Sequence, residues 1–575
     1  MDALRLFAFR PLALPRLWRA FFIRAAAALW LLAAACAAAA PGREGAAIAS
    51  AHPLATEAGY RILAEGGNAF DAAIAVGAAL AVVEPYSSGL GGGGFWLLHR
   101  AADNRQVMVD ARETAPAAAT AEMFKDGEGR VRSGATLDGG KAAAIPGVPA
   151  GLVHLAREYG RLPLARTLAP AIALAREGFA VDPRFARIAK MRETFLQGGA
   201  GTQAFLERGA APAAGFRLRQ PALATTLETL AAEGRDGFYR GRLARALVEG
   251  ANAAGGVWTL DDLAGYRVVE RAPLRFTYRG ATITTASLPS GGGPTLAQAL
   301  NILERFEPVD ARAPAGAHLV IEALRRAFQD RARYLGDSDF VRVPVAELVA
   351  KDYARRRAAG IDQRAATPSA TLAPGVLDKA ESGNTTHYSI IDSAGNRVAA
   401  TLSINYLFGA GVVPAGTGVL LNDEMDDFTL AAELPNAYRL RSGEANRIEP
   451  RKRPLSSMTP TFVEDARGVL VLGAPGGSRI ISQVLLAVLD YLGANALDLE
   501  RIVAAPRYHH QFWPDRVEIE PEAFGADWRA ALVQKGHALQ TGSRRWGNMQ
   551  LAFRAADGAT LAVASDPRGL DIGWY

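Results

Sequence analysis

Cysteine is nearly absent from this chain, which has one cysteine, Cys36, among its 575 residues. A single thiol can form neither an intramolecular disulfide nor a thiolate metal site, so a hydrophobic core must hold the fold together. Aromatic residues are also few, at 8%, whereas 50% of the residues are hydrophobic and 21% are charged. This composition is typical of a globular protein and excludes collagen-like, mucin-like and largely disordered chains.

The chain also has little excess charge once its first residues are set aside. Residues 1–41 hold five arginines and one aspartate, so 59 of the 64 basic and 57 of the 58 acidic residues belong to the remainder. A body so nearly balanced does not favour a nucleic-acid partner. We interpret the short run Arg451-Lys452-Arg453 as solvated surface charge.

Residues 1–41 are predicted to be an export signal. Arg5 to Arg24 form a basic region, and residues 25–42 carry no charge. The apolar run Ala25–Ala35 is too short to predict a membrane span, and small residues follow it as signal peptidase requires. Cys36 ends this run and is similar to a bacterial lipoprotein cleavage site whose leucine stands one place early. A plain secretory signal and a lipoprotein signal with a lipid anchor both stay open, and they place the protein in the periplasm or on a bacterial membrane.

Several common catalytic motifs are missing. None of the eight histidines has the HExxH spacing, and neither a GxSxG nor a GxxxxGK[ST] motif is present. The glycines of residues 89–94 match GxGxxG, but the pattern predicts a helix before them and a strand after them. A dinucleotide site needs the reverse order, so we expect a tight connection. The sequence therefore predicts no metal and no cofactor.

The pattern along the body predicts mixed helices and strands. Helices are expected at 53–65 and 72–83, the second buried on every side after an N-cap at Asn68, and residues 150–360 are mostly helical apart from a strand-like stretch at 274–287. Residues 355–384 are polar and are predicted to be exposed and mobile. A hairpin follows at 385–405. We place a boundary between Asn384 and Thr385.

Six polar or glycine-rich segments occur in a specific order. They are residues 89–94, 110–116, 384–389, 421–428, 453–460 and 473–479. Together they resemble the gamma-glutamyltransferases (glutathione hydrolases), and the resemblance extends from about Ala49 to Tyr575. It implies an N-terminal-nucleophile hydrolase of the α+β class, a four-layer αββα sandwich with mainly antiparallel sheets. It also implies a precursor that cuts itself into a large subunit, residues 42–384, and a small catalytic subunit, residues 385–575.

The resemblance assigns the nucleophile to Thr385, whose hydroxyl first attacks the Asn384–Thr385 bond. A hydroxyl is a weak nucleophile until a base takes its proton, and the α-amine released by that cut is a suitable base. Ser403 stands where the family usually has a threonine bonded to the nucleophile. Ser403 and Asn405 lie two residues apart on the return strand, so both are expected to face Thr385. Gly476 and Gly477 precede a helix and match the oxyanion-hole pair.

The resemblance also implies a pocket for the two charges of a γ-glutamyl group. Arg112, Ser456 and Ser457 match the residues that bind the α-carboxylate. Asn405, Glu424 and Asp427 match those that bind the α-ammonium, although many bacterial relatives have glutamine in place of Glu424. Tyr438 matches the tip of a lid over the pocket, formed by residues 435–440.

The resemblance thus predicts a γ-glutamyltransferase that acts on glutathione and other γ-glutamyl compounds and transfers the group to water, amino acids or dipeptides. A glutaryl or cephalosporin acylase would use the same threonine without needing an ammonium pocket. A non-catalytic binding protein of the same fold would have lost Thr385 or the two glycines, and all three are present.

Overall fold

The protein is described here from a computed structural model, which describes residues 45–131, 134–372, 385–430, 436, 440 and 442–569. The predicted signal at residues 1–41 with Cys36, the residue Asn384 before the predicted cut, and Tyr438 lie outside the described residues. Within the described ranges, no helix is both long and apolar enough to cross a membrane.

The first large sheet carries the predicted hairpin at its centre. Its strand order is β1 (Ala47–Ser50), β9 (Thr386–Ile391), β10 (Arg397–Ser403), β2 (Gly93–Arg100), β3 (Arg105–Ala111) and β6 (Val269–Arg271), and all neighbours are antiparallel. In the hairpin, Arg397 pairs with Ile391 and Leu402 with Thr386. Thr385 therefore lies directly before a central strand of the sheet.

The second large sheet is also antiparallel throughout. Its order is β17 (Leu561–Ser565), β16 (Gln550–Ala555), β12 (Gly468–Gly473), β11 (Thr461–Asp465), β8 (Ala281–Thr285) and β7 (Leu274–Tyr278). The stretch predicted as one strand at 274–287 forms two, because the chain turns at Arg279 and Gly280, whose φ angles are 47° and 85°.

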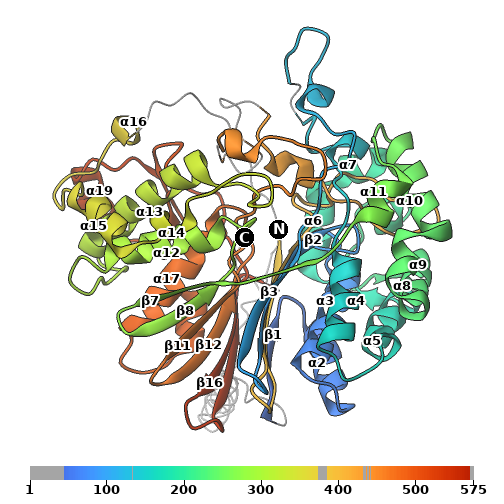
Figure 1. Ribbon diagram of the computed structural model, residues 1–575, viewed down its shortest axis with the longest axis horizontal. Coiled ribbons are helices and arrows are strands. Elements are labelled where there is room, and N and C mark those ends of the chain that lie inside the picture. The colour runs from blue at the N-terminus through green and yellow to red at the C-terminus, as the bar shows by residue number, and fades with distance from the viewer. Residues whose placement is uncertain are drawn as a thin grey trace, which may run out of the picture. The chain divides into compact units, whose positions relative to one another are not determined.

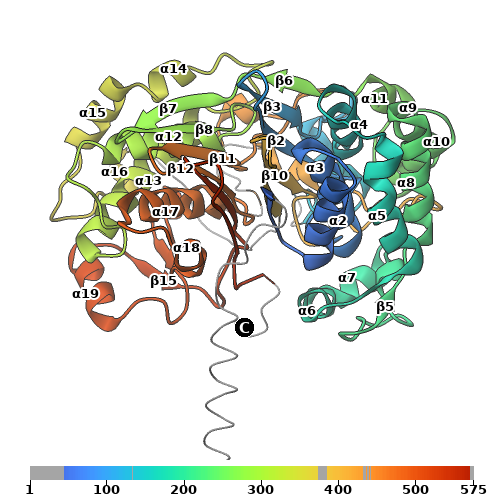
Figure 2. The same ribbon diagram turned by 90° about the horizontal axis from the view of Figure 1, so that it is seen from below.

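The two sheets pack face to face between two layers of helices (Figure 2). On the first sheet lie α2 (Pro53–Ala64), α3 (Ala69–Val83) and α4 (Val148–Glu158), with α5 (Leu164–Glu177) and α8 (Pro221–Glu233) packed outside them; on the second lie α12 (Gly292–Leu303) and α17 (Arg479–Gly493), with α13 (Pro314–Tyr334) packed outside α12. This arrangement, in which Figure 1 shows the two sheets side by side between the helices, confirms the predicted αββα sandwich.

The first sheet contributes side chains to two hydrophobic cores, one against its helices and one between the sheets, because side chains alternate along each strand. Ile390 and Ala400 pack against the helices of the first layer, whereas their neighbours Ile391 and Ala399 pack between the sheets against Phe462 and Val471. Successive side chains of a strand point to opposite faces, so strands buried on both sides read as nearly continuous apolar runs.

The remaining helices and strands complete the helical layers and the connections around the sheets. They are α6 (Pro183–Met191), α7 (Glu193–Gly198), α9 (Arg235–Tyr239), α10 (Gly241–Ala253), α11 (Leu260–Gly265), α14 (Val345–Leu348), α15 (Lys351–Ala359), α16 (Ser369–Leu372), α18 (Leu499–Ala504), α19 (Ala526–Gln534), β4 (Phe179–Ala180), β5 (Arg217–Leu218), β13 (Tyr508–His509), β14 (Val517–Ile519) and β15 (Leu539–Thr541).

The predictions for the N-cap of α3 and for the glycine connection before β2 are confirmed, because each depends on residues close together in the sequence. Asn68 caps α3, its side chain accepting from the Asp71 backbone while Asp71 accepts from Asn68, and every residue of α3 is buried. The glycines before β2 lie in a close-packed connection, as predicted, because a Cβ on Gly91 or Gly92 would lie 2.0 Å from the carbonyl oxygen of Leu420 or Ser403. The turn therefore tolerates only glycine at these two positions.

Two expectations about polar segments had different outcomes. Most of residues 355–372 are exposed, as expected, but the stretch includes part of α15 and all of α16, and Ser369 is buried and accepts a hydrogen bond from Arg325. The expectation for residues 451–453 was wrong for two of the three. Lys452 and Arg453 are buried rather than solvated, and Arg453 donates to the backbone carbonyl of Arg112. Partners from distant parts of the chain make the burial of these polar groups favourable.

Candidate active site

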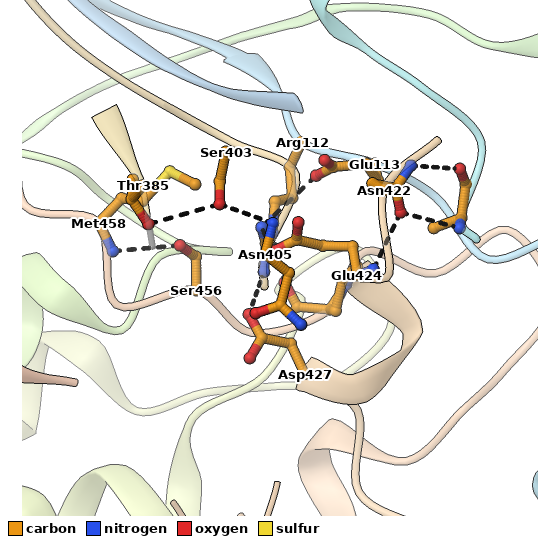
Figure 3. Close-up of polar contacts among 12 residues, drawn as sticks. Arg112, Glu113, Thr385, Ser403, Asn405, Asn422, Glu424, Asp427, Ser456 and Met458 are labelled. Carbon is orange, nitrogen blue, oxygen red and sulfur yellow. Dashed lines mark hydrogen bonds and ion pairs between the residues drawn. The ribbon is translucent and has the colours of Figure 1, made fainter. Parts of the chain in front are cut away.

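Thr385 is buried at the start of the central hairpin. Its Oγ1 lies 3.4 Å from the Oγ of Ser403, at the end of the neighbouring strand β10 (Figure 3). The Ser403 hydroxyl also accepts a 2.8 Å hydrogen bond from the backbone N–H of Asn405, which fixes its position. The pairing of β9 with β10 thus brings together the two hydroxyls that the sequence separates by 18 residues.

Asn405 departs from the expected strand geometry. Strand β10 ends at Ser403, and Asn405 has a φ of 69°. The prediction that strand alternation aims both side chains at Thr385 is therefore wrong for Asn405. Its Nδ2 instead donates to the carbonyl oxygen of Asp423, 3.0 Å away, which ties the end of the hairpin to the loop that carries Glu424.

The glycine pair lies in the loop before α17. Gly476 and Gly477 have φ angles of 127° and 57°, which L side chains rarely adopt. Gln483, one turn inside α17, donates a 2.8 Å hydrogen bond to the carbonyl of Pro475 and holds the loop. Gly477 and Thr385 line the same pocket. The pocket thus combines a hydroxyl with an unhindered backbone at a helix N-terminus, where developing negative charge is stabilised.

Most of the predicted binding residues gather at this pocket, but Arg112 and Asn405 do not line it. Its lining comprises Thr385, Ser403, Glu424, Asp427, Leu440, Ser456, Ser457, Met458, Gly477, Ser478 and Ile480. Arg112 is not among them, because it is fully buried behind the two acidic residues. Asn436 and Leu440, the two described residues of the predicted lid, also reach the site: Asn436 Nδ2 donates to Asp427 Oδ1 over 2.8 Å, and Leu440 lines the pocket.

Arg112 is bonded to the acidic side chains predicted to bind the opposite charge of the substrate. Its Nη1 pairs with Glu424 and its Nη2 with Asp427, and its Nε donates to the carbonyl of Pro454 over 3.2 Å (Figure 3). Glu113 is a third carboxylate near the same guanidinium, with 3.4 Å between Arg112 Nη1 and Glu113 Oε2. The sequence predicted these groups as separate partners of a ligand, and the structure shows that they neutralise one another.

Three carboxylates around one guanidinium cannot all carry charge at low cost. Burial raises the pKa of Glu113 to about 7, although Arg112 lowers it, and burial raises the pKa of Glu424 well above its usual range. Burial opposes the charge of Arg112, but Glu424, Glu113 and Asp427 together raise its pKa. We therefore expect the pair Glu113 and Glu424 to hold a proton near neutral pH. Among the described residues, Glu424 Oε2 and Glu113 Oε1 have no hydrogen-bond partner.

The two serines present their hydroxyls to the pocket from the loop before β11. Ser456 Oγ accepts a 3.1 Å hydrogen bond from the backbone N–H of Met458, and Ser457 Oγ accepts a 2.9 Å hydrogen bond from Arg331. Their roles in binding a carboxylate remain a prediction that this geometry accommodates.

Sequence reasoning missed three residues of the site: Glu113, Asn422 and Arg331. Asn422 Oδ1 accepts from the N–H groups of Ala144 and Glu424, and its Nδ2 donates to the carbonyl of Gly91, so it holds the Glu424 loop against the glycine loop. Glu113 and Asn422 lie inside the segments that carry the resemblance, and that position was a usable signal. Arg331 lies outside them, in the middle of α13.

One histidine cluster could in principle accommodate a metal. Ligand atoms of His318, Glu322 and His537 lie within 4.8 Å of one another. The carboxylate of Glu322 already accepts from Arg325 and Arg326, and two guanidinium groups oppose a further cation. The His318 and His537 rings share a 2.8 Å hydrogen bond. These contacts fit the predicted hydrogen-bonding histidines.

The sequence model of the gamma-glutamyltranspeptidase family matches residues 55–573. The chain belongs to this family. It is 42% identical to a glutathione hydrolase proenzyme of Pseudomonas sp. (strain A14), covering 86% of each chain, and 41% identical to the glutathione hydrolase proenzyme of Escherichia coli (strain K12), covering 91% of this chain and 90% of that one. It is also 39% identical to the acylase ACY 1 proenzyme of Pseudomonas sp. (strain SE83), over 89% and 90% of the two chains.

Among solved structures, the cephalosporin acylase from Bacillus halodurans superimposes with a TM-score of 0.81 at 29% identity, covering 92% of this chain and 95% of that one. A solved acylase therefore shares the fold of this chain. The fold alone does not separate a γ-glutamyl enzyme from an acylase, so the chemistry of the pocket must decide between them.

Proposed function

We propose that this chain is a γ-glutamyltransferase and glutathione hydrolase in which Thr385 is the nucleophile. The observation that carries the proposal is the pocket that joins Thr385 and Ser403 to Gly477 on one side and to Glu424, Asp427 and two serines on the other. A nucleophile, an oxyanion site and a bipolar binding site within one pocket are the parts that transfer of an amino-acid acyl group requires.

The reaction proceeds in two steps. The hydroxyl of Thr385 gives its proton to the Thr385 α-amine and attacks the γ-carbonyl carbon of the substrate, forming a tetrahedral oxyanion against Gly476 and Gly477. Collapse breaks the γ-amide bond, the leaving amine takes the proton, and a γ-glutamyl ester of Thr385 remains. Water, or the amine of an amino acid or dipeptide, then attacks the ester and restores the hydroxyl.

Binding of the γ-glutamyl end would exchange partners within the charged cluster. The α-ammonium would replace some of the contacts that Arg112 makes with Glu424 and Asp427. Glu424 Oε2, which has no hydrogen-bond partner among the described residues, is a buried atom that could accept from it. The α-carboxylate would then bind to Arg112, Ser456 and Ser457. A zwitterionic ligand leaves the net charge of this buried cluster unchanged, so the exchange does not require burial of a new unpaired charge.

The second candidate is a glutaryl or cephalosporin acylase, favoured by the structural match to the Bacillus halodurans enzyme. A glutaryl group has a carboxylate but no ammonium. It would leave Glu424 and Asp427 to share Arg112, and the buried Glu424 Oε2 would stay without a partner. The pocket therefore suits the γ-glutamyl group better.

We also propose that the chain matures by cutting itself between Asn384 and Thr385. Mature protein should contain a C-terminal fragment of residues 385–575, about 20 kDa by proportion of the 60.8 kDa chain, whose N-terminal sequence begins at Thr385. Thr385→Ala should stay uncut and inactive, and Thr385→Ser, which keeps the hydroxyl, should still be cut. An uncut wild-type chain that releases glutamate from glutathione would overturn this assignment.

Export by residues 1–41 is a further part of the proposal, supported by the basic and apolar pattern of that segment. If Cys36 carries lipid, Cys36→Ala removes the anchor and moves the protein from the membrane fraction to the soluble periplasmic fraction. Stable anchoring needs more than one acyl chain, so the lipidated Cys36 would have to carry several. Wild-type protein in the soluble fraction would instead support a plain secretory signal, and retention in the cytoplasm would contradict export.

A further inference from the structure

Arg331, on α13, lies directly behind the serine loop of the pocket. Its side chain is buried, with 2% of the residue exposed, and its Nη2 donates to Ser457 Oγ over 2.9 Å and to the Ser456 carbonyl over 3.4 Å. Burial lowers its pKa to about 10, with Asp427 acting against this shift and Arg112 reinforcing it. Arg331 is therefore still a cation at neutral pH.

The charge of Arg331 is not balanced in the way that its neighbours on α13 are. Arg325 and Arg326 both pair with Glu322. Among the described residues, no carboxylate lies within ion-pair distance of Arg331, and its Nε and Nη1 have no hydrogen-bond partner. A buried cation without an anion is costly, so a carboxylate bound nearby would lower the energy of this region.

The hydrogen bond from Arg331 also decides how Ser457 can act. A serine hydroxyl has one proton to donate and two lone pairs to accept with, whereas a guanidinium can only donate. Ser457 Oγ uses a lone pair to accept from Arg331, so its own proton is available to another acceptor. Ser457 lines the pocket, with 8% of the residue exposed, and an acceptor held there is within its reach. Met458 N–H makes the Ser456 hydroxyl a donor in the same way.

We propose that Arg331 is a specificity-determining positioning residue for the substrate carboxylate: it makes Ser457 a hydrogen-bond donor and places a second positive charge behind it. This inference rests on the proposed function, since it concerns the α-carboxylate of a γ-glutamyl group. Until an ammonium group displaces it, Arg112 is neutralised by Glu424 and Asp427, so Arg331 supplies a positive charge that those carboxylates do not pair with.

The test compares three p-nitroanilides that differ only in the charged end of the acyl group. The γ-glutamyl substrate has both charges, the glutaryl substrate has only the carboxylate, and the 4-aminobutyryl substrate has only the ammonium. Arg331→Met should lower kcat/KM for the two carboxylate substrates by about 10- to 100-fold, the usual effect of losing a charged hydrogen bond, mainly through KM. The 4-aminobutyryl substrate should change by less than about threefold.

Two further variants separate positioning from structural damage. Arg333→Met makes the same substitution two residues along α13, at an exposed position, and should leave all three substrates unchanged. Ser457→Ala should show the same substrate pattern as Arg331→Met. Because Arg331 acts through Ser457, kcat/KM of the double variant should be little lower than that of the more impaired single variant.

The outcomes distinguish this inference from the proposed function. An equal loss for all three substrates would overturn the inference and assign Arg331 a purely structural role, as would no loss for any. If Arg331→Met does not mature, Arg331→Lys decides in its place: it should show a smaller loss confined to the carboxylate substrates, and a uniform loss would overturn the inference. A wild-type enzyme that prefers the glutaryl substrate would overturn the proposed function. The role of Arg331 would then still be tested by comparing the losses for the glutaryl and 4-aminobutyryl substrates.

Discussion

The ammonium site is best tested at Asp427. Its carboxylate pairs with Arg112, accepts from Asn436 Nδ2 and lines the pocket, and its side chain is 11% exposed. Removing one partner of a buried ion pair typically costs about 3–5 kcal/mol. Partial exposure and the remaining pair between Arg112 and Glu424 favour the lower end, about 3 kcal/mol, which corresponds to about two decades in kcat/KM.

The assay is kcat/KM of matured Asp427→Ala for γ-glutamyl and glutaryl p-nitroanilides. We expect about a hundredfold loss for the γ-glutamyl substrate and a much smaller loss for the glutaryl substrate, which has no ammonium. Asp426→Asn is a matched control, because Asp426 belongs to the same short helical turn but accepts from Thr136, 2.6 Å away. An equal loss for both substrates would refute the assignment of Asp427 and strengthen the acylase alternative.

Three further results follow from the same geometry. Ser403→Ala removes the hydroxyl 3.4 Å from Thr385 Oγ1 and should lower kcat about 3- to 10-fold, whereas Ser403→Thr should retain activity; equal kcat in both variants would count against this contact. Gly477→Ala forces a Cβ onto a φ of 57° and should lower kcat about 100-fold while KM changes by less than about threefold, whereas a change in KM alone would exclude an oxyanion role. The inhibition constant of L-glutamate should fall as pH rises through the pKa of about 7 of Glu113, because the shared proton leaves and the carboxylates can then neutralise an ammonium. Glutarate should show no such fall, Glu424→Gln should flatten the profile for glutamate, and a profile that Glu424→Gln leaves unchanged would contradict the shared proton.

The parts of the fold that depend on local chemistry could be predicted from the sequence. The capping box of Asn68 and Asp71, the hairpin that begins after Thr385, and the glycines before α17 each involve neighbours a few residues apart. Residues that the resemblance assigns in separate segments also meet in the folded chain, since Thr385, Ser403, Asp427 and the two serines line one pocket.

What the sequence could not show was which charges are paired and which are buried. The pairing of Arg112 with Glu424 joins residues 312 positions apart, and the buried Arg453 and Arg331 read as ordinary basic residues in their own segments. A charge is stable in the interior only when distant elements provide its partners, and those elements meet only in the folded chain.

The sequence by itself therefore determined the capped helix and the hairpin, because period, caps and turn residues act over short distances. The layers and the candidate reacting groups came from the resemblance to the family. The tertiary structure alone decided that Asn405 leaves the strand, that Arg112 is neutralised behind the pocket, and that Arg331 reaches Ser457. The reason is physical: the energy of a buried charge or hydroxyl depends on every group within a few ångströms, and packing brings these groups together from across the whole chain.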